Sequence, residues 1–224
     1  MDYPILYSLQ HCPYAMRARM GIILSEQCVR LRAIVLKDKP AEMLIASPKG
    51  TVPVLVLENQ ETNTPEVIDE SLDVMLWALK QSDPSNLLYN HQPEMLDEML
   101  NLISLFDTEF KGHLENYKSA KRYHDDNKDD CRQECEIYIA QLEQKLVQHQ
   151  YLMGDQLSLV DYAVLPFIRQ FAKVERQWYL KSPYPKLQQW LKSHLDSALF
   201  SKVMRKYPLW LENHKEVLFG NINQ

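Results

Sequence analysis

The first third of the chain alternates between two hydrophobic periods, one typical of strands and one typical of helices. A short apolar run at residues 5–7 predicts a strand, and residues 13–24 follow with a helical pattern. From residue 29 to residue 35 every second side chain is apolar, which predicts another strand. This part of the chain therefore begins with a βαβ unit.

Shorter segments complete this first part. The pattern predicts a helical turn at residues 41–45, a buried strand at 53–57 and a short strand at 67–68. Apolar residues spaced three and four apart between residues 72 and 79 predict a further helix. The resulting order is βαβαββα, which predicts helices packed against a small mixed sheet.

The rest of the chain has the pattern of an all-helical domain. A polar, proline-containing stretch at residues 82–86 predicts a linker. Helical stripes follow, and residues 159–171 are apolar on nearly all sides, which is typical of a helix in the middle of its domain. Ser158 and Asp161 stand before this segment at the spacing of a capping box.

Two domains are therefore expected. We predict an α/β domain at residues 1–82 and an all-α domain at residues 93–224. The residues from 210 onward are expected to be a tail that packs through Trp210 and Phe219.

Composition and charge narrow the class of protein. The chain has 224 residues, 46% hydrophobic and 25% charged, which is an ordinary globular composition. A net charge of −5 argues against a nucleic-acid partner, because such a partner needs a basic face. No leader-like start is visible, and no apolar run approaches the roughly 20 residues of a membrane helix. A cytoplasmic protein without a membrane or nucleic-acid partner is expected.

Cys12 is the strongest candidate for chemistry. It stands directly before Pro13 at the start of the predicted helix, and proline favours the first helical position. The unpaired N–H groups and dipole of a helix N-terminus stabilise a thiolate, which is the nucleophilic form of cysteine. The alternative is a small buried hydrophobic residue that happens to precede a helix. Because Ala15 occupies the position of a resolving cysteine, Cys12 would work as a monothiol.

The other cysteines carry less information. Cys131 and Cys135 are four residues apart on a predicted helix, but two further ligands at metal spacing are missing, so no metal site is expected. Cys28 is interpreted as structural. Arg17 and Arg19 fall outside the buried line of the first helix and are interpreted as surface charge.

Three further positions carry alternatives. Pro53 begins a buried strand, and the Val52–Pro53 bond is either trans or cis; the cis form would direct the Val52 backbone towards a peptide ligand. Ser71 is either a helix N-cap alone or, together with Glu70, part of a grip on an α-amino acid group. Lys39 is a surface lysine that could also meet a ligand carboxylate.

Taken in order, these motifs resemble those of the cytosolic glutathione transferases, and more narrowly the cysteine-type, omega-like members. The resemblance is carried by Cys12-Pro13-Tyr14-Ala15, Lys37-Asp38-Lys39-Pro40, Thr51-Val52-Pro53-Val54-Leu55, Glu70-Ser71 and Ser158-Leu159-Val160-Asp161-Tyr162. It covers nearly the whole chain. It implies a thioredoxin-like domain that binds glutathione and a helical domain that lines the second-substrate site. A homodimer and a bacterial source are also expected.

The resemblance also implies roles for individual residues. Val52 would pair with the cysteinyl backbone of glutathione through a cis-Pro53 turn. Glu70 and Ser71 would hold the γ-glutamyl end, and Lys39 would face the glycyl end. Cys12 would attack sulfur rather than polarise the glutathione thiol.

We therefore expect an enzyme that uses glutathione as co-substrate and removes glutathione from thiols through a Cys12–glutathione mixed disulfide. One alternative is conjugation or isomerisation of a small electrophile by glutathione. Another is a non-catalytic regulatory protein that resembles stringent starvation protein A. Retention of Cys12, Val52-Pro53 and Glu70-Ser71 together argues against the regulator.

Overall fold

The computed structural model describes residues 3–58 and 64–220, and its contacts divide the chain into two compact units. Within the described residues, the first unit comprises the chain up to Ser85 together with the segment from Ser197 onward. The second unit is Asn86–Asp196. The polypeptide thus leaves the first unit and returns to it at its end.

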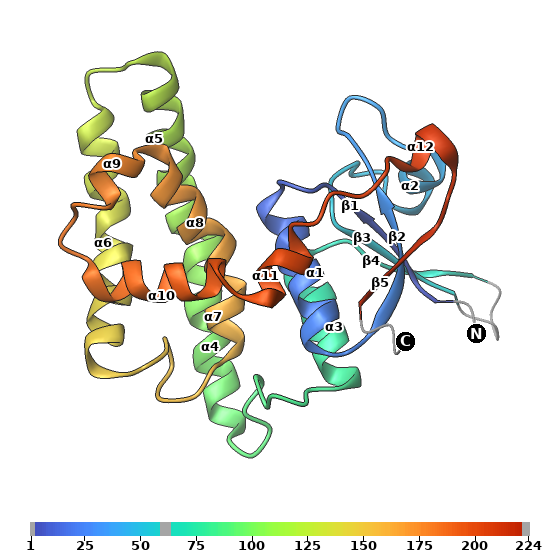
Figure 1. Ribbon diagram of the computed structural model, residues 1–224, viewed down its shortest axis with the longest axis horizontal. Coiled ribbons are helices and arrows are strands. Elements are labelled where there is room, and N and C mark those ends of the chain that lie inside the picture. Colours follow the sequence, from blue (N-terminus) through green and yellow to red (C-terminus); the bar gives the residue numbers. More distant parts are fainter. Residues whose placement is uncertain (1–2, 59–63, 221–224) are drawn as a thin grey trace. The chain divides into compact units, whose positions relative to one another are not determined.

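The first unit is built on a five-stranded mixed sheet with the strand order β4-β3-β1-β2-β5 (Figure 1). Strands β1 and β2 are parallel, and every other neighbouring pair is antiparallel. The strands are β1 (Ile5–Ser8), β2 (Cys28–Ala33), β3 (Val54–Leu57), β4 (Glu66–Ile68) and β5 (Val217–Gly220).

The helices of this unit fall at the predicted places. The βαβαββα order is confirmed, and two short helices follow in the returning segment. The helices are α1 (Pro13–Leu24), α2 (Ala41–Ala46), α3 (Ser71–Gln81), α11 (Ala198–Val203) and α12 (Trp210–Asn213).

Helices α1 and α3 cover one face of the sheet (Figure 1) and bury its main core. Leu6, Val29 and Leu55 point into this core from three strands and are almost fully buried. The two helices approach closely at Gly21, where a Cβ atom would lie only 2.7 Å from the Met75 Cα. A larger residue at this position would push the helices apart, so glycine is required there.

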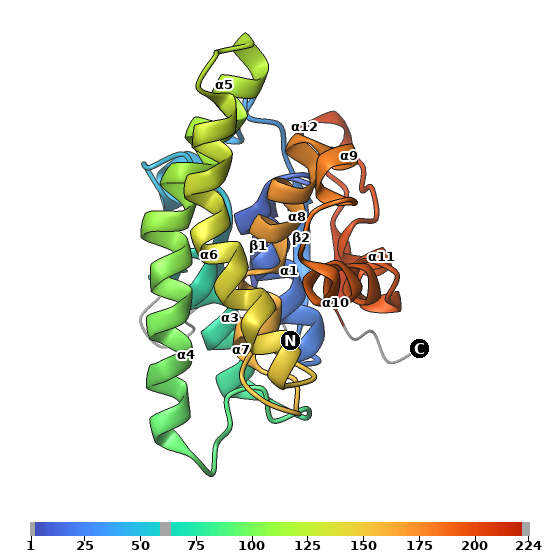
Figure 2. The ribbon, with the colours of Figure 1, turned by 90° about the vertical axis from the view of Figure 1, so that its left-hand side faces the viewer.

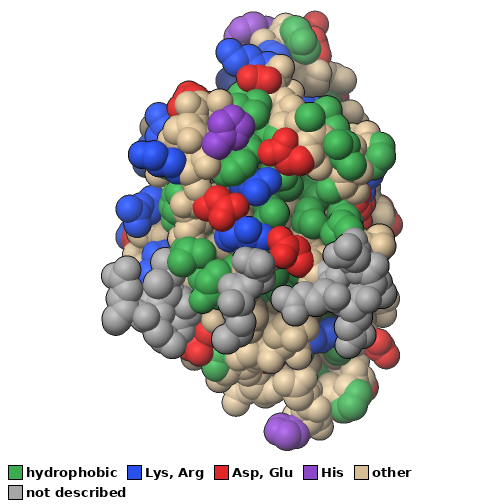
Figure 3. Space-filling view, turned by 90° about the vertical axis from the view of Figure 1, so that its right-hand side faces the viewer, with side chains coloured by type: hydrophobic (Ala, Val, Ile, Leu, Met, Phe, Trp, Pro, Cys, Tyr) green, Lys and Arg blue, Asp and Glu red, His purple; other side chains and the backbone are tan. Residues whose placement is uncertain are grey.

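The opposite face of the sheet is partly apolar and partly ionic. Tyr7 and Val54 pack with Met43 of α2 in a second buried cluster. Further along β2, Arg30 and Arg32 form ion pairs with Glu216, at 3.5 and 3.1 Å. Figure 3 shows acidic, basic and apolar side chains interleaved on the side of the molecule opposite α1 and α3.

The end of the chain corrects the expected domain limits. We predicted an all-α domain at residues 93–224, but β5 pairs with β2 and the segment from Ser197 belongs to the first unit. The expected packing of Phe219 is found, since this residue is 3% exposed and joins the main core. Its burial explains the correction, because β5 both completes the sheet and covers the core next to β2.

The described residues of the second unit form helices and the loops that connect them, with one isolated bridge between Tyr151 and Gly154. Helix α5 packs along α6, and Figure 2 shows the rod formed by α4, η1 and α5 from end to end. The elements are α4 (Pro93–Leu105), the π-helical turn η1 (Phe106–Phe110), α5 (Lys111–Tyr123), α6 (Lys128–Gln148), α7 (Leu159–Ala163), α8 (Leu165–Val174), α9 (Arg176–Tyr179) and α10 (Pro185–Leu195). Within residues 3–58 and 64–220, no helix is both long and apolar enough to cross a membrane.

The predicted capping box is present and anchors this unit. Asp161 is fully buried and accepts hydrogen bonds from the Ser158 backbone N–H at 3.0 Å and from the Ser158 hydroxyl at 2.7 Å. It also accepts hydrogen bonds from the Leu152 N–H at 3.1 Å and from the Trp190 indole at 2.9 Å. One carboxylate therefore ties the start of α7 to the preceding loop and to α10.

A second carboxylate, that of Glu175 between α8 and α9, links this point of the chain to α5 and α6. Glu175 accepts hydrogen bonds from the Tyr117 hydroxyl at 2.9 Å and from Lys128 at 2.6 Å, and Arg132 contacts it at 3.3 Å. Burial alone would raise the pKa of Glu175, but the Lys128 and Tyr117 hydrogen bonds outweigh it and lower the pKa to about 2.

Candidate functional site

The site begins at Cys12, which is the residue that caps helix α1. Its backbone is extended, with φ −71° and ψ 126°, and Pro13 occupies the start of the helix as predicted. The side chain is half-buried, and its Sγ lies 3.9 Å from the Val52 carbonyl oxygen. The sulfur therefore meets the loop before β3 at the N-terminal end of α1.

The Val52–Pro53 peptide bond is cis, so of the two alternatives the trans form is wrong. Val52 is 6% exposed, and Pro53 directly precedes β3. The Val52 carbonyl oxygen lies 3.9 Å from the Cys12 Sγ. A backbone segment with its own polar groups thus lies beside the candidate nucleophile.

Glu70 and Ser71 lie at the N-terminus of α3. The capping residue is Glu70, one position before the predicted Ser71, and Ser71 begins the helix. The Ser71 side chain is buried, and its hydroxyl accepts a long hydrogen bond of 3.4 Å from Arg17. The first turn of α3 has backbone N–H groups without helical partners, which favours a carboxylate ligand there.

Lys49 joins this end of α3 and was not predicted from the sequence. Its ammonium donates to the Glu70 carboxylate at 2.5 Å and to the Asp69 carboxylate at 3.2 Å. Asp69 also accepts from the Ser47 hydroxyl at 2.6 Å, and this hydrogen bond is the main cause that lowers the pKa of Asp69. Two carboxylates and one ammonium are thus gathered beside the start of α3.

Lys39 lies near the loop that leads to Val52. It is half-buried, and an ideal Cβ on Gly50 would be 3.2 Å from its Nζ. Gly50 has a φ of +63°, a conformation that favours glycine. The Lys39 ammonium therefore lies next to Gly50, two positions before Val52.

The burial of Arg17 and Arg19 differs from what the sequence predicted. We expected surface charges, but the two residues are 1% and 3% exposed. Arg19 donates to the Leu9 carbonyl at 3.1 Å, to the Gln10 carbonyl at 2.7 Å and to the Ser8 hydroxyl at 2.5 Å. It also reaches the Val203 carbonyl at 2.9 Å. Burial lowers the pKa of Arg19 to about 10, so it remains charged at neutral pH.

Arg19 is linked to the candidate nucleophile through a shared acceptor. The Leu9 carbonyl receives both the Arg19 guanidinium and the Cys12 backbone N–H, the latter at 3.3 Å. The Leu9 carbonyl, in the loop between β1 and α1, is therefore held by two donors, the Arg19 guanidinium and the Cys12 backbone N–H. Hydrophobic periodicity could not have shown this, because it scores an arginine as an exposed residue.

The remaining cysteines differ from Cys12 in their surroundings. Cys135 is buried, and burial raises its pKa to about 12, which keeps it a thiol. Burial also raises the pKa of the Cys28 thiol. In the described part of the chain, no cluster of three histidine, cysteine or acidic residues is arranged to hold a metal ion.

The arrangement as a whole suits a small ligand that carries charges of both signs. A thiol and a cis-prolyl backbone segment lie together, and a helix N-terminus lies beside paired carboxylates and a lysine. Backbone N–H groups and lysines recognise carboxylates, whereas Asp69 and Glu70 can receive an ammonium group. The chemistry available at the thiol is nucleophilic attack.

Two family models match consecutive parts of the chain. The model for the glutathione S-transferase N-terminal domain matches residues 6–86, and the model for the glutathione S-transferase C-terminal domain matches residues 125–193. Together the two matches span more than half of the sequence.

Individual proteins agree with the family models. Pyrimidodiazepine synthase of Drosophila melanogaster is 25% identical over 198 residues, which cover 83% of this chain and 74% of that protein. Glutathione S-transferase omega-1 of Mus musculus is 26% identical over 189 residues, with the same coverage. A glutathione transferase structure from Pseudomonas putida, with one glutathione disulfide bound per subunit, has a TM-score of 0.79 and 15% identity. That comparison covers 92% of this chain and 93% of the other.

Proposed function

The chain belongs to the glutathione transferase superfamily, and from this premise we propose that it is a glutathione-dependent thiol transferase that acts through Cys12. Its substrate is a mixed disulfide between glutathione and another thiol. Within the superfamily we propose an omega-like member of bacterial origin, cytoplasmic and dimeric. Glutathione is the co-substrate, and the reaction uses no metal.

The proposed reaction consists of two thiol–disulfide exchanges. The Cys12 thiolate attacks the glutathione sulfur of the substrate, and the substrate sulfur leaves as a thiolate that takes a proton. A second glutathione thiolate then attacks the glutathione sulfur bound to Cys12. This step forms glutathione disulfide and releases the Cys12 thiolate, so the substrate thiol is set free and one free glutathione is oxidised, joined to the glutathione that came from the substrate.

The observation that carries the proposal is the position of Cys12 without a second thiol in its helix turn. Cys12 caps α1 with its side chain half-buried, and the residue three positions later, Ala15, is fully buried and carries no sulfur. A helix N-terminus stabilises the thiolate that the attack requires. The second thiol must come from solution, which is the role given to glutathione.

We assign the glutathione-binding roles as the resemblance implies. Val52, next to cis-Pro53, pairs with the cysteinyl backbone, and its carbonyl lies close to Cys12, which supports this role. Glu70 and Ser71 bind the γ-glutamyl group at the start of α3, and Lys39 receives the glycyl carboxylate. To these we add Lys49, because it holds the Glu70 carboxylate directly.

A second candidate function is glutathione addition to, or isomerisation of, a small electrophile at the same thiol. It is favoured by the match to a protein named for the synthesis of a small molecule, pyrimidodiazepine. This function would need the same residues for glutathione but would not require release of a substrate thiol.

The test is intact-mass spectrometry of the full chain after incubation with glutathione disulfide. We expect one glutathione adduct on the protein, which added reduced glutathione removes. Cys12→Ser should form no adduct. Cys131→Ser is the matched control, because Cys131 is also half-buried and should leave the adduct unchanged.

Three outcomes would count against the proposal. An adduct that persists in Cys12→Ser would place the exchange on another cysteine. If no adduct forms but glutathione still binds, the result would favour the conjugating function. If no adduct forms and glutathione does not bind, the result would favour the regulatory alternative.

A further inference from the structure

A pocket of about 370 Å³ lies in the first unit, between the end of β2, the loop from β1 to α1, and the returning segment. Its lining residues come from two stretches of that unit, residues 8–35 and 205–212. None of the residues assigned to glutathione takes part in it, but Leu9, Gln10 and His11 do, and they lead directly into Cys12. A ligand in this pocket would therefore lie against the loop that carries Cys12. The volume suits a small organic molecule.

The walls of this pocket are held together by specific contacts. Leu209 forms a parallel bridge with Ala33 at the end of β2. The indole of the next residue, Trp210, donates a hydrogen bond of 2.7 Å to a carboxylate of α2. The Gln10 side chain donates to the Met204 carbonyl at 2.8 Å. The returning segment is thus fixed both to β2 and to the β1–α1 loop.

The inner wall of the pocket is apolar. Leu31 and Ile34, at the end of β2, line it and are each 3% exposed. Leu209 and Tyr207 are half-buried and line it from the returning segment. The Tyr207 ring packs against Phe219 of the main core, with 6.0 Å between the ring centroids. This wall favours a ligand with an apolar group, because burying that group removes apolar surface from water.

Exposed side chains with charges of both signs also line the pocket. They are Arg205, Lys206 and Glu212. The Arg205 guanidinium lies over the Tyr207 ring, 5.6 Å from its centroid. Among residues 3–58 and 64–220, neither Lys206 nor Glu212 forms an ion pair or a side-chain hydrogen bond. A carboxylate and an ammonium group thus border the same pocket without neutralising each other.

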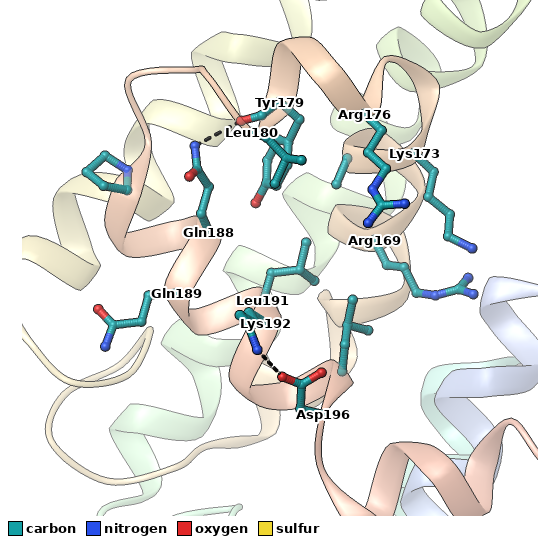
Figure 4. A pocket seen from close by; sticks show the side chains of 13 residues that line it. Arg169, Lys173, Arg176, Tyr179, Leu180, Gln188, Gln189, Leu191, Lys192 and Asp196 are labelled. Carbon is teal, nitrogen blue, oxygen red and sulfur yellow. Dashed lines mark hydrogen bonds and ion pairs between the residues drawn. The ribbon is translucent and has the colours of Figure 1, made fainter.

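The larger pocket of the second unit, of about 740 Å³, differs in this respect (Figure 4). Its acidic lining residue, Asp196, forms an ion pair with Lys192 of α10. A ligand that brings an ammonium group to Asp196 would have to displace Lys192, whereas Glu212 can receive one directly. The pocket of the first unit is therefore the better fit for a ligand that carries both charges.

We propose that the pocket of the first unit binds an apolar α-amino acid. Its carboxylate is received by Arg205 and Lys206, its ammonium group by Glu212, and its side chain lies against Leu31 and Leu209. An α-amino acid carries both charges and an apolar group on one carbon atom, which matches charged groups of both signs beside an apolar wall. A ligand with a single charge would pair with one side only. The site is separate from the thiol chemistry proposed for Cys12, and its test does not depend on that chemistry.

The test is a ligand-observed NMR titration of the full chain with L-phenylalanine at pH 7. Two matched probes each lack one charge: 3-phenylpropanoate has no ammonium group, and 2-phenylethylamine has no carboxylate. We expect phenylalanine to bind at least about tenfold more tightly than either probe, a difference of about 1.4 kcal/mol. L-Alanine, which has both charges but no ring, should also bind at least about tenfold more weakly. Saturating glutathione disulfide should leave the affinity for phenylalanine unchanged.

Variants of the lining assign the two charges. Glu212→Gln should weaken the binding of phenylalanine about tenfold and leave 3-phenylpropanoate unchanged, because that probe has no ammonium group. Arg205→Gln combined with Lys206→Gln should weaken both ligands about tenfold, because both carry the carboxylate. All three residues are exposed, so these substitutions remove charge without opening the core.

Two controls carry the same changes of charge outside the pocket lining. Glu66→Gln removes an exposed carboxylate of β4. Lys202→Gln combined with Lys215→Gln removes two exposed positive charges of the returning segment. Neither control should change the affinity for phenylalanine or for 3-phenylpropanoate.

Four results would each overturn the inference. Phenylalanine could fail to bind. 3-Phenylpropanoate could bind as tightly as phenylalanine, which would remove the role of the ammonium group. Glu212→Gln and Glu66→Gln could weaken phenylalanine equally, which would indicate a general effect of surface charge. Displacement of phenylalanine by glutathione disulfide would place it in the glutathione site, at the start of α3.

Discussion

Replacing Arg19 by methionine tests how strongly one buried charge holds the first unit together. Methionine has a similar length and fits a buried position, but it offers no donors. The guanidinium makes four hydrogen bonds, three to residues 8–10 and one to Val203. The substitution therefore separates the β1–α1 loop from the returning C-terminal segment at one point.

The magnitude follows from two opposing contributions. A pKa of about 10 in place of the ordinary 12.5 means that burial costs the charged Arg19 roughly 3 kcal/mol. Each hydrogen bond to a charged donor contributes about 1.5–3 kcal/mol, so the four bonds more than offset this cost. Because some of the released carbonyls will find water, we expect Arg19→Met to lower the free energy of unfolding by about 3–5 kcal/mol.

Chemical denaturation at pH 7 measures this loss, and amide hydrogen exchange locates it. Exchange should accelerate most in residues 197–220, which Arg19 holds through Val203. Arg122→Met is the matched control, since Arg122 is exposed, and it should change stability by less than about 0.5 kcal/mol. A loss below about 1 kcal/mol for Arg19→Met, or unchanged exchange in that segment, would refute the reasoning.

Three further substitutions test the second unit. Asp161→Ala should lower the free energy of unfolding by about 3–5 kcal/mol, because it leaves buried donors without an acceptor; a melting temperature within a degree or two of the parent would contradict this. Glu175→Gln should lower the free energy of unfolding by up to roughly 3 kcal/mol at pH 7. The pKa of Glu175 is about 2 in the folded protein and 4.5 ordinarily, so the difference in unfolding free energy between the parent and the variant should shrink as the pH falls from 4.5 towards 2. Chemical denaturation at several pH values measures this difference, and a difference that stays constant would contradict the prediction. Tyr179→Phe should raise stability by about 1 kcal/mol, because it removes a buried hydroxyl without a partner; a loss of similar size in thermal unfolding would show that the hydroxyl is satisfied.

Local patterns were sufficient to predict the elements of the first unit up to Ser85. Strand and helix periods differ, and proline at residues 13 and 53 marks the starts of α1 and β3. Cys12 could be placed at a helix N-terminus for the same reason. The isomer of the Val52–Pro53 bond could not be predicted, because both forms fit the same local pattern.

The features that the sequence did not predict depend on distant residues. Arg19 is buried because carbonyls from residues 9, 10 and 203 surround it, and the last of these is 184 positions away. Strand β5 is a short apolar run whose partner, β2, lies near the other end of the chain. Lys49 looks like an ordinary loop lysine until the fold brings Asp69 and Glu70 to it.

The return of the chain to its first unit has a consequence for its synthesis. Cys28 of β2 pairs with Gly220 of β5, so the two strands leave the ribosome nearly a whole chain length apart. Until β5 is made, the nascent first unit exposes the edge of β2, and an unpaired edge is a template for other strands. Translation that stops early after α11 would release a protein with both helices of its main core in place but with this edge still open. The final residues therefore determine whether the newly made chain stays apart from its neighbours.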